Sequence, residues 1–140
     1  MESLISGNSD RFGKRLSELV EAIFSFYDTA GKQEERVYHI FVLGLLAQLT
    51  HRFIIRSNRE SGLGRYDLMM LPKEGEERGI IMEFKRADSV EELDATLTAA
   101  HQQIAERRYE AELDAAQVTK RSIIAVAFCG KTVRINAIHK

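Results

Sequence analysis

The sequence contains a single cysteine, Cys129, a single proline and no tryptophan among its 140 residues. One cysteine excludes a disulfide framework and a four-cysteine zinc site. No apolar run approaches the length of about 18 residues that a membrane-spanning helix needs, and the N-terminal region lacks the apolar core of a signal peptide. These absences leave a soluble protein of the cytoplasm as the expectation.

Neither sign of charge is in excess, since 20 Lys and Arg against 21 Asp and Glu give a net charge of −1. Any nucleic-acid-binding surface would therefore have to be local. One local excess exists between residues 51 and 65, and taken alone it reads as a solvated basic face. It contains Arg52, Arg56, Arg59 and Arg65, with Glu60 as the single carboxylate.

The length of 140 residues, with 44% hydrophobic and 29% charged residues, suits one globular domain. Residues 1–10 are polar and without a period, which predicts a flexible lead-in. Over residues 12–27 apolar side chains recur at steps of three and four, which predicts a helix. A second helix is predicted over about residues 32–50, and because it is apolar on most sides we expect it to be buried.

The middle of the sequence is rich in β-forming residues. Residues 51–57 and 65–71 are predicted as strands joined by a turn, the second ended by Pro72, which cannot donate to a sheet. A third strand is predicted over residues 79–85, with a period of two. One of its faces carries Ile80, Met82 and Phe84, and the other carries Ile81, Glu83 and Lys85.

The last third of the sequence returns to a helix and then to strands. A helix is predicted from residue 88 or 89 to about residue 116, followed by strands over residues 122–129 and 132–138. The order is thus α-α-β-β-β-α-β-β. We expect an α/β domain with a mixed sheet of four or five strands flanked by helices.

Two charged residues on an otherwise apolar strand, Glu83 and Lys85, mark the candidate site. Burying either charge is unfavourable unless it meets a partner or a cation. Asp67 adds a third charge on the preceding strand. A hairpin register that pairs Leu71 near Gly79 brings Asp67 opposite Glu83, so two carboxylates and an ammonium converge at one end of two paired strands.

This grouping suits the hydrolysis of phosphodiesters. Mg²⁺, or Mn²⁺ in its place, prefers oxygen ligands and commonly binds one or two carboxylates together with water and substrate phosphate. Asp67 and Glu83 would hold the ion with the backbone carbonyl of Phe84, and Lys85 would orient the attacking water. The alternative is a surface ion pair between Glu83 and Lys85 beside a turn aspartate.

The sequence around these residues resembles the PD-(D/E)XK nucleases, in which an aspartate ends a hairpin strand and Glu-x-Lys lies on the next strand. Four stretches are similar to one bacterial branch of this superfamily, namely residues 35–46, 57–72, 81–88 and 103–109. In that branch the nuclease-like domain commonly follows an AAA-type ATPase-like domain. The resemblance implies a restriction-endonuclease-like core, and the chain looks like the C-terminal part of a longer protein.

The resemblance also implies roles for individual residues. Asp67, Glu83 and Lys85 match the metal-binding acids and the lysine of the family's core. Glu35, on the helix before the strands, matches the acid that many members place beside the metal. The proline of the family's name is absent, and Tyr66 precedes Asp67 in its place.

Further residues are implied to border the active site. Gln103 and Tyr109 fit the Gln…Tyr element of RecB-like relatives. The resemblance places Gln103 with the catalytic residues and makes Tyr109 a contact to nucleic acid. Arg59 and Arg65 lie in the turn leading to Asp67, where they would bind the phosphate backbone of the nucleic acid near the metal. The implied activity is Mg²⁺- or Mn²⁺-dependent cleavage of DNA, as an endo- or exonuclease with little sequence specificity.

Two other interpretations remain open. The same fold could act as a docking or nucleic-acid-binding module that serves an ATPase-like partner and never cuts, which a net charge near zero mildly favours. The three charged residues could also be plain surface charge. The expected partners are nucleic acid, DNA above all, and an ATPase-like domain in the same chain or nearby, with a homodimer left open and no membrane involved.

Four residues near these motifs are given plainer roles. Tyr38 and His39, on the second predicted helix, are interpreted as packing residues, although either could orient Glu35. Arg107 and Arg108 are interpreted as a solvated face, with contact to phosphate as the second interpretation.

Overall fold

A mixed sheet forms the centre of the computed structural model, which describes residues 2–23, 34–57, 60–62 and 64–140. Its five strands lie in the order β1-β4-β5-β6-β7. Only the β5–β6 pair is parallel, and the other neighbours are antiparallel. The predicted mixed α/β sheet is therefore confirmed. The strands are β1 Phe53–Ser57, β4 Leu68–Pro72, β5 Gly79–Arg86, β6 Arg121–Cys129 and β7 Thr132–His139.

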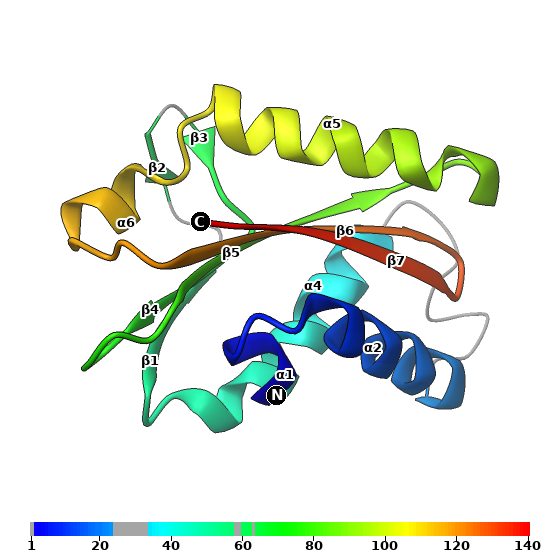
Figure 1. Ribbon diagram of the computed structural model, residues 1–140. Coiled ribbons are helices and arrows are strands. Elements are labelled where there is room, and N and C mark those ends of the chain that lie inside the picture. Colours follow the sequence, from blue (N-terminus) through cyan, green and yellow to red (C-terminus); the bar gives the residue numbers. More distant parts are fainter. Residues whose placement is uncertain (1, 24–33, 58–59, 63) are drawn as a thin grey trace.

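Three helices cover one face of the sheet, namely α1 Glu2–Ile5, α2 Ser9–Ile23 and α4 Glu34–Leu46, the last followed by the 3₁₀ turn η1 Ala47–Leu49 (Figure 1). Their apolar sides pack on Ile80, Met82 and Phe84 of β5, as the predicted alternation requires. The helix predicted over residues 12–27 is confirmed as far as Ile23, and residues 24–27 lie outside the described part.

Two predictions for this layer are wrong in part. Residues 1–10 are not simply a lead-in, because α1 buries Leu4 and Ile5 against the helical layer. The sequence did not indicate this contact, since its two apolar residues lie among polar ones. Helix α4 is buried along one side only, with Ile40 58% exposed. A single layer of helices on this face gives α4 one partner surface, which is why its wide apolar arc is not fully covered.

The opposite face carries α5 Leu93–Glu106, preceded by the 3₁₀ turn η2 Val90–Glu92, and α6 Ala111–Ala115 (Figure 1). The single helix predicted up to about residue 116 is therefore wrong over residues 107–110, which separate α5 from α6. The chain turns at Arg108, whose φ of 53° is left-handed. This turn directs Tyr109 into the core beneath it, where it packs with Leu113 and Ile81, so burial outweighs the local preference to continue the helix.

A short ribbon precedes β4. Strands β2 Glu60–Ser61 and β3 Gly64–Arg65 pair in an antiparallel manner, where the sequence predicted a turn and the start of a longer strand. The longer strand begins only at Leu68, because Tyr66 turns fully into the core against the ring of Tyr109. Asp67 is thereby left at the end of the sheet, outside the β4–β5 ladder.

No helix in the described ranges combines the length and apolar character needed to cross a bilayer.

Candidate active site

The site lies just before the first residue of β4, where the antiparallel β5 continues past it. The two strands pair Met70 with Ile80 and Leu68 with Met82, the register predicted from the sequence. One step further along this ladder, Asp67 comes opposite Glu83. Strand β5 runs on to Arg86, past Met82, the partner of the first residue of β4, so its final residues have no paired residue of β4 on that side.

Two carboxylates take the place of the missing strand. The amide of Phe84 donates to Oδ2 of Asp67 over 2.8 Å, and the amide of Arg86 donates to Oε1 of Glu35 over 3.1 Å. Backbone amides rarely remain without an acceptor in a folded protein. Glu35 is exposed on α4, yet this bond holds its carboxylate at the same edge of β5 as Asp67.

The carbonyl of Phe84 shares this edge. Within a strand, the N–H and C=O of one residue point towards the same neighbouring strand. Since the N–H of Phe84 is directed at Asp67, its carbonyl oxygen is directed to the same side. The predicted third oxygen ligand is thus oriented consistently with the first.

The side chain of Glu83 points to the face of the sheet that α5 covers, and only 3% of its surface is exposed. Gln103 of α5 donates through Nε2 to Oε1 of Glu83 over 2.6 Å and to the hydroxyl of Tyr109 over 3.1 Å. The other carboxylate oxygen, Oε2, is buried without a hydrogen-bond partner. An unsatisfied carboxylate oxygen is costly, so this atom is the natural place for a cation or a proton.

The surroundings of the site favour the protonated forms of its acids. Burial, reinforced by the negative charge of Asp67, raises the pKa of Glu83 to about 8. Burial also raises the pKa of Asp67, although the amide of Phe84 acts in the opposite direction. The half-buried Lys85 and the carboxylate of Glu35 are close enough to act on both acids, Lys85 lowering each pKa and Glu35 raising it. The structure thus brings four of the predicted residues within electrostatic reach of one another.

His39 belongs to this group, where the sequence indicated a packing residue that could also orient Glu35. Its ring is buried, stacks on Phe84 with ring centroids 5.6 Å apart, and lies 2.8 Å through Nε2 from the hydroxyl of Ser57. Its charge acts to lower the pKa of Asp67, against the larger effect of burial. The signal in the sequence was the spacing of four residues from Glu35, which places both side chains on one side of a helix.

Three residues were predicted to contact nucleic acid, namely Arg59, Arg65 and Tyr109. Tyr109 is not a surface residue, because its ring is buried with 2% exposure and its burial raises the pKa of its hydroxyl. Its role is to hold Gln103, and the prediction of a direct nucleic-acid contact is corrected. Arg59 lies outside the described residues, as does the side chain of Arg65, whose backbone belongs to β3.

The donor set consists of oxygen atoms, which suits a hard divalent cation such as Mg²⁺ or Mn²⁺. Such a cation would give the partnerless Oε2 of Glu83 a ligand bond, and its positive charge would offset the burial that raises the pKa of both acids. In the described part of the chain, however, no three His, Cys, Asp or Glu side chains stand close enough to hold a metal ion by themselves. Backbone, water or substrate oxygens would have to complete the coordination.

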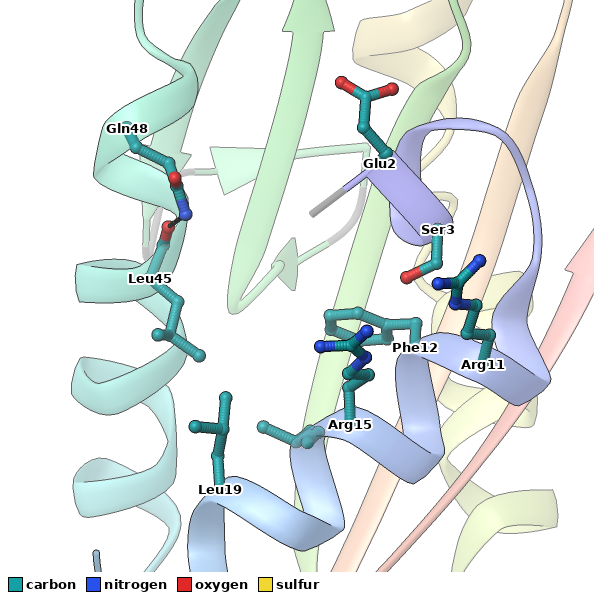
Figure 2. Close-up of a pocket in the computed structure, with 9 residues that line it drawn as sticks. Glu2, Ser3, Arg11, Phe12, Arg15, Leu19, Leu45 and Gln48 are labelled. Carbon is teal, nitrogen blue, oxygen red and sulfur yellow. Dashed lines mark hydrogen bonds between the residues drawn. The ribbon is translucent and has the colours of Figure 1, made fainter.

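A cavity of about 390 Å³ lies away from this site, between α2 on one side and α4 with η1 on the other (Figure 2). Phe12, Leu19 and Leu45 form its apolar wall, and Arg11 and Arg15 lie along its rim. It belongs to the helical layer on the face of the sheet opposite Gln103, so it is not the chemical centre.

Comparisons with known proteins identify the family of the chain. The model of the PD-(D/E)XK nuclease superfamily matches residues 33–138. A solved structure described as "Crystal structure of SSO0001" is similar over 91% of this chain, with 14% identity and a TM-score of 0.41, and this chain spans 62% of that protein. No curated protein matches the sequence. The five-stranded mixed sheet flanked by helices is the restriction-endonuclease-like core that the resemblance implied. With a family match that extends from the start of α4 to the end of β7, the chain belongs to the PD-(D/E)XK nuclease superfamily.

Proposed function

We propose that this domain is a metal-dependent nuclease that hydrolyses DNA phosphodiester bonds at Asp67 and Glu83. The observation that carries the proposal is the buried, partnerless Oε2 of Glu83, a residue that lies next to Asp67 one step past the last β4–β5 pair. A buried carboxylate with an open coordination position next to a second carboxylate is a common arrangement for a divalent cation.

Three groups would hold the cation, namely the carboxylates of Asp67 and Glu83 and the carbonyl of Phe84. The carboxylate of Glu35, at the edge of β5 that it shares with Asp67, would add negative charge beside the ion. When bound, a divalent cation lowers the pKa of a water molecule and polarises the phosphate. The hydrogen bond from Phe84 fixes Asp67, and the bond from Gln103 fixes Glu83, so both acids are oriented before substrate arrives.

Lys85 contributes a positive charge on the Glu83 side of β5. An ammonium cannot bind a cation, so its role is to orient the attacking water and to stabilise the negative charge that grows on the phosphate oxygens. The half-burial of Lys85 strengthens this effect relative to bulk water, because screening is weaker there.

A second function is a nuclease-like module that binds nucleic acid or docks on an ATPase-like partner without cutting. One observation favours it, namely that the described side chains alone do not complete a metal site. An ATPase-like domain in the same chain or nearby, and pairing into a homodimer, belong to the proposal in either form.

Cleavage assays over a panel of nucleic acids distinguish the two functions. Wild type and Glu83→Ala are compared on double-stranded, single-stranded and branched DNA and on RNA, with Mg²⁺, Mn²⁺ or a chelator. The nuclease proposal expects metal-dependent cleavage of DNA by the wild type and a loss of at least about a hundredfold in the variant. Metal binding by a wild type that cuts no substrate would replace the nuclease with the docking module.

A further inference from the structure

The turn between α5 and α6 carries two adjacent arginines, Arg107 and Arg108. Both side chains are exposed, and neither forms an ion pair with any residue that the structure describes. Cations after a helix interact favourably with its C-terminal dipole, and this alone could explain them. Two further observations give the turn a more specific role.

The first observation is that the turn is fixed against the β2–β3 ribbon. A methyl group added at Gly62 would lie 2.2 Å from the carbonyl oxygen of Arg108 and 2.6 Å from that of Arg107, so only glycine allows this approach. Arg108 itself has a left-handed φ of 53°, which a non-glycine residue adopts at some cost. The surrounding contacts hold the turn in this conformation, so the two arginines are presented in a fixed place.

The second observation is a chain of contacts from Arg107 to the carboxylates. A methyl group added at Gly64 would lie 3.2 Å from Cδ of Arg107 and 3.4 Å from the hydroxyl of Tyr109, so both side chains pass over the same glycine. The hydroxyl of Tyr109 is bonded to Gln103, and Gln103 is bonded to Glu83. Two side chains, Tyr109 and Gln103, therefore connect the neighbourhood of Arg107 to Glu83. The charge of Arg107 is also close enough to Tyr109 to act on the pKa of its hydroxyl, which it lowers.

We propose that Arg107 and Arg108 bind the phosphate backbone of the nucleic acid next to the bond that the Asp67–Glu83 site would cut. This inference rests on the proposed function. The planar guanidinium matches phosphate oxygens in two-point contacts, and such contacts set the position of a substrate without reading its sequence. An acidic protein segment fits less well, because its carboxylates would meet those of Glu83 and Asp67 without supplying a reacting phosphate.

The test measures binding in the absence of cleavage. A labelled DNA duplex, and its single strand, are titrated with the full chain in EDTA by fluorescence anisotropy at several salt concentrations. The test variant is Arg107→Gln/Arg108→Gln. The matched control, Arg11→Gln/Arg15→Gln, removes the same charge from exposed arginines on the far face of the sheet (Figure 2). Thermal unfolding and Mn²⁺ affinity report whether the variants stay folded with an intact carboxylate site.

We expect the test variant to bind DNA about tenfold more weakly at low salt. Its plot of log affinity against log salt should be shallower by about 1.8, from 0.9 for each of two phosphate contacts to a duplex. The control should stay within about twofold of the wild type, since it lacks those contacts. Equal weakening in both variants, no weakening in the test variant, or a wild type that binds no DNA would each overturn the inference. Equally tight binding of polyglutamate would replace it with a protein-docking face.

The nuclease proposal is tested separately, by measuring whether the wild type cleaves DNA with Mn²⁺. A wild type that binds DNA through the two arginines but cuts nothing supports the inference and overturns the nuclease. A wild type that cuts DNA, with a test variant that binds and cuts equally well, supports the nuclease and overturns the inference.

Discussion

Glu83 gives the metal-free domain a stability that falls as pH rises. Its pKa of about 8 in the folded protein exceeds the ordinary value of 4.5 that it regains on unfolding. Between these two values the folded protein keeps a proton that the unfolded chain releases. The contribution to stability is therefore fully present below pH 4.5 and is lost as the pH rises through 8.

The size of the effect follows from the pKa difference. Each unit corresponds to about 1.4 kcal/mol, so the free energy of unfolding should fall by on the order of 3 kcal/mol between pH 5 and pH 8. This is a large fraction of the stability of a domain of this size. Burial is the main cause, and the charge of Asp67 adds to it.

The assay is denaturant unfolding at several pH values in a chelator, repeated with Mn²⁺. Glu83→Gln keeps the bond from Gln103 and cannot ionise, so it should lose most of the fall seen in the wild type and most of the stabilisation by Mn²⁺ at pH 8. Glu106→Gln, a change of the same type at an exposed position on α5, should behave like the wild type. A wild-type slope that persists in Glu83→Gln would refute the reasoning.

Three further outcomes are expected. Lys85→Ala should lose cleavage by at least about a hundredfold while it keeps its affinity for Mn²⁺ in calorimetric titration, whereas Glu83→Ala should lose both, because only the carboxylate is a ligand. Gly62→Ala should lower the free energy of unfolding more than Gly75→Ala, by about 1–2 kcal/mol or more. Both glycines have a positive φ, which costs a residue with a side chain about 1–2 kcal/mol. Only at Gly62, of these two, would the added methyl group lie within 4 Å of other backbone atoms. Glu35→Gln should lower the pKa of Glu83, measured by carbon NMR of the carboxyl groups, because it removes a nearby negative charge.

Local sequence patterns predicted the sheet well. The alternation over residues 80–85 follows directly from the two faces of a pleated strand, and it correctly separated Phe84 from Ile81 and Glu83. The hairpin register also followed from the sequence, since Pro72 and the glycine-containing turn leave few ways to pair the flanking apolar residues. These features depend on neighbours along the chain.

Features that depend on distant contacts could not be predicted. The bonds from Gln103 to Glu83 and to Tyr109 require the turn at Arg108, and a helical sequence pattern gives no sign that the chain will bend there to bury a tyrosine. His39 was likewise hidden, because its neighbours Phe84 and Ser57 come from two strands that follow it in the chain.

The central claim is that Glu83, protonated in the metal-free protein, becomes a metal ligand. Mn²⁺ titration at pH 7 by calorimetry, in buffers of different ionisation enthalpy, counts the protons that binding releases. With a pKa of about 8, Glu83 is mostly protonated at pH 7 and must lose its proton to bind a cation. The wild type should release close to one proton for each ion bound, and Glu83→Gln should bind more weakly and release almost none. Binding without proton release in the wild type, or equal release in both proteins, would contradict the claim.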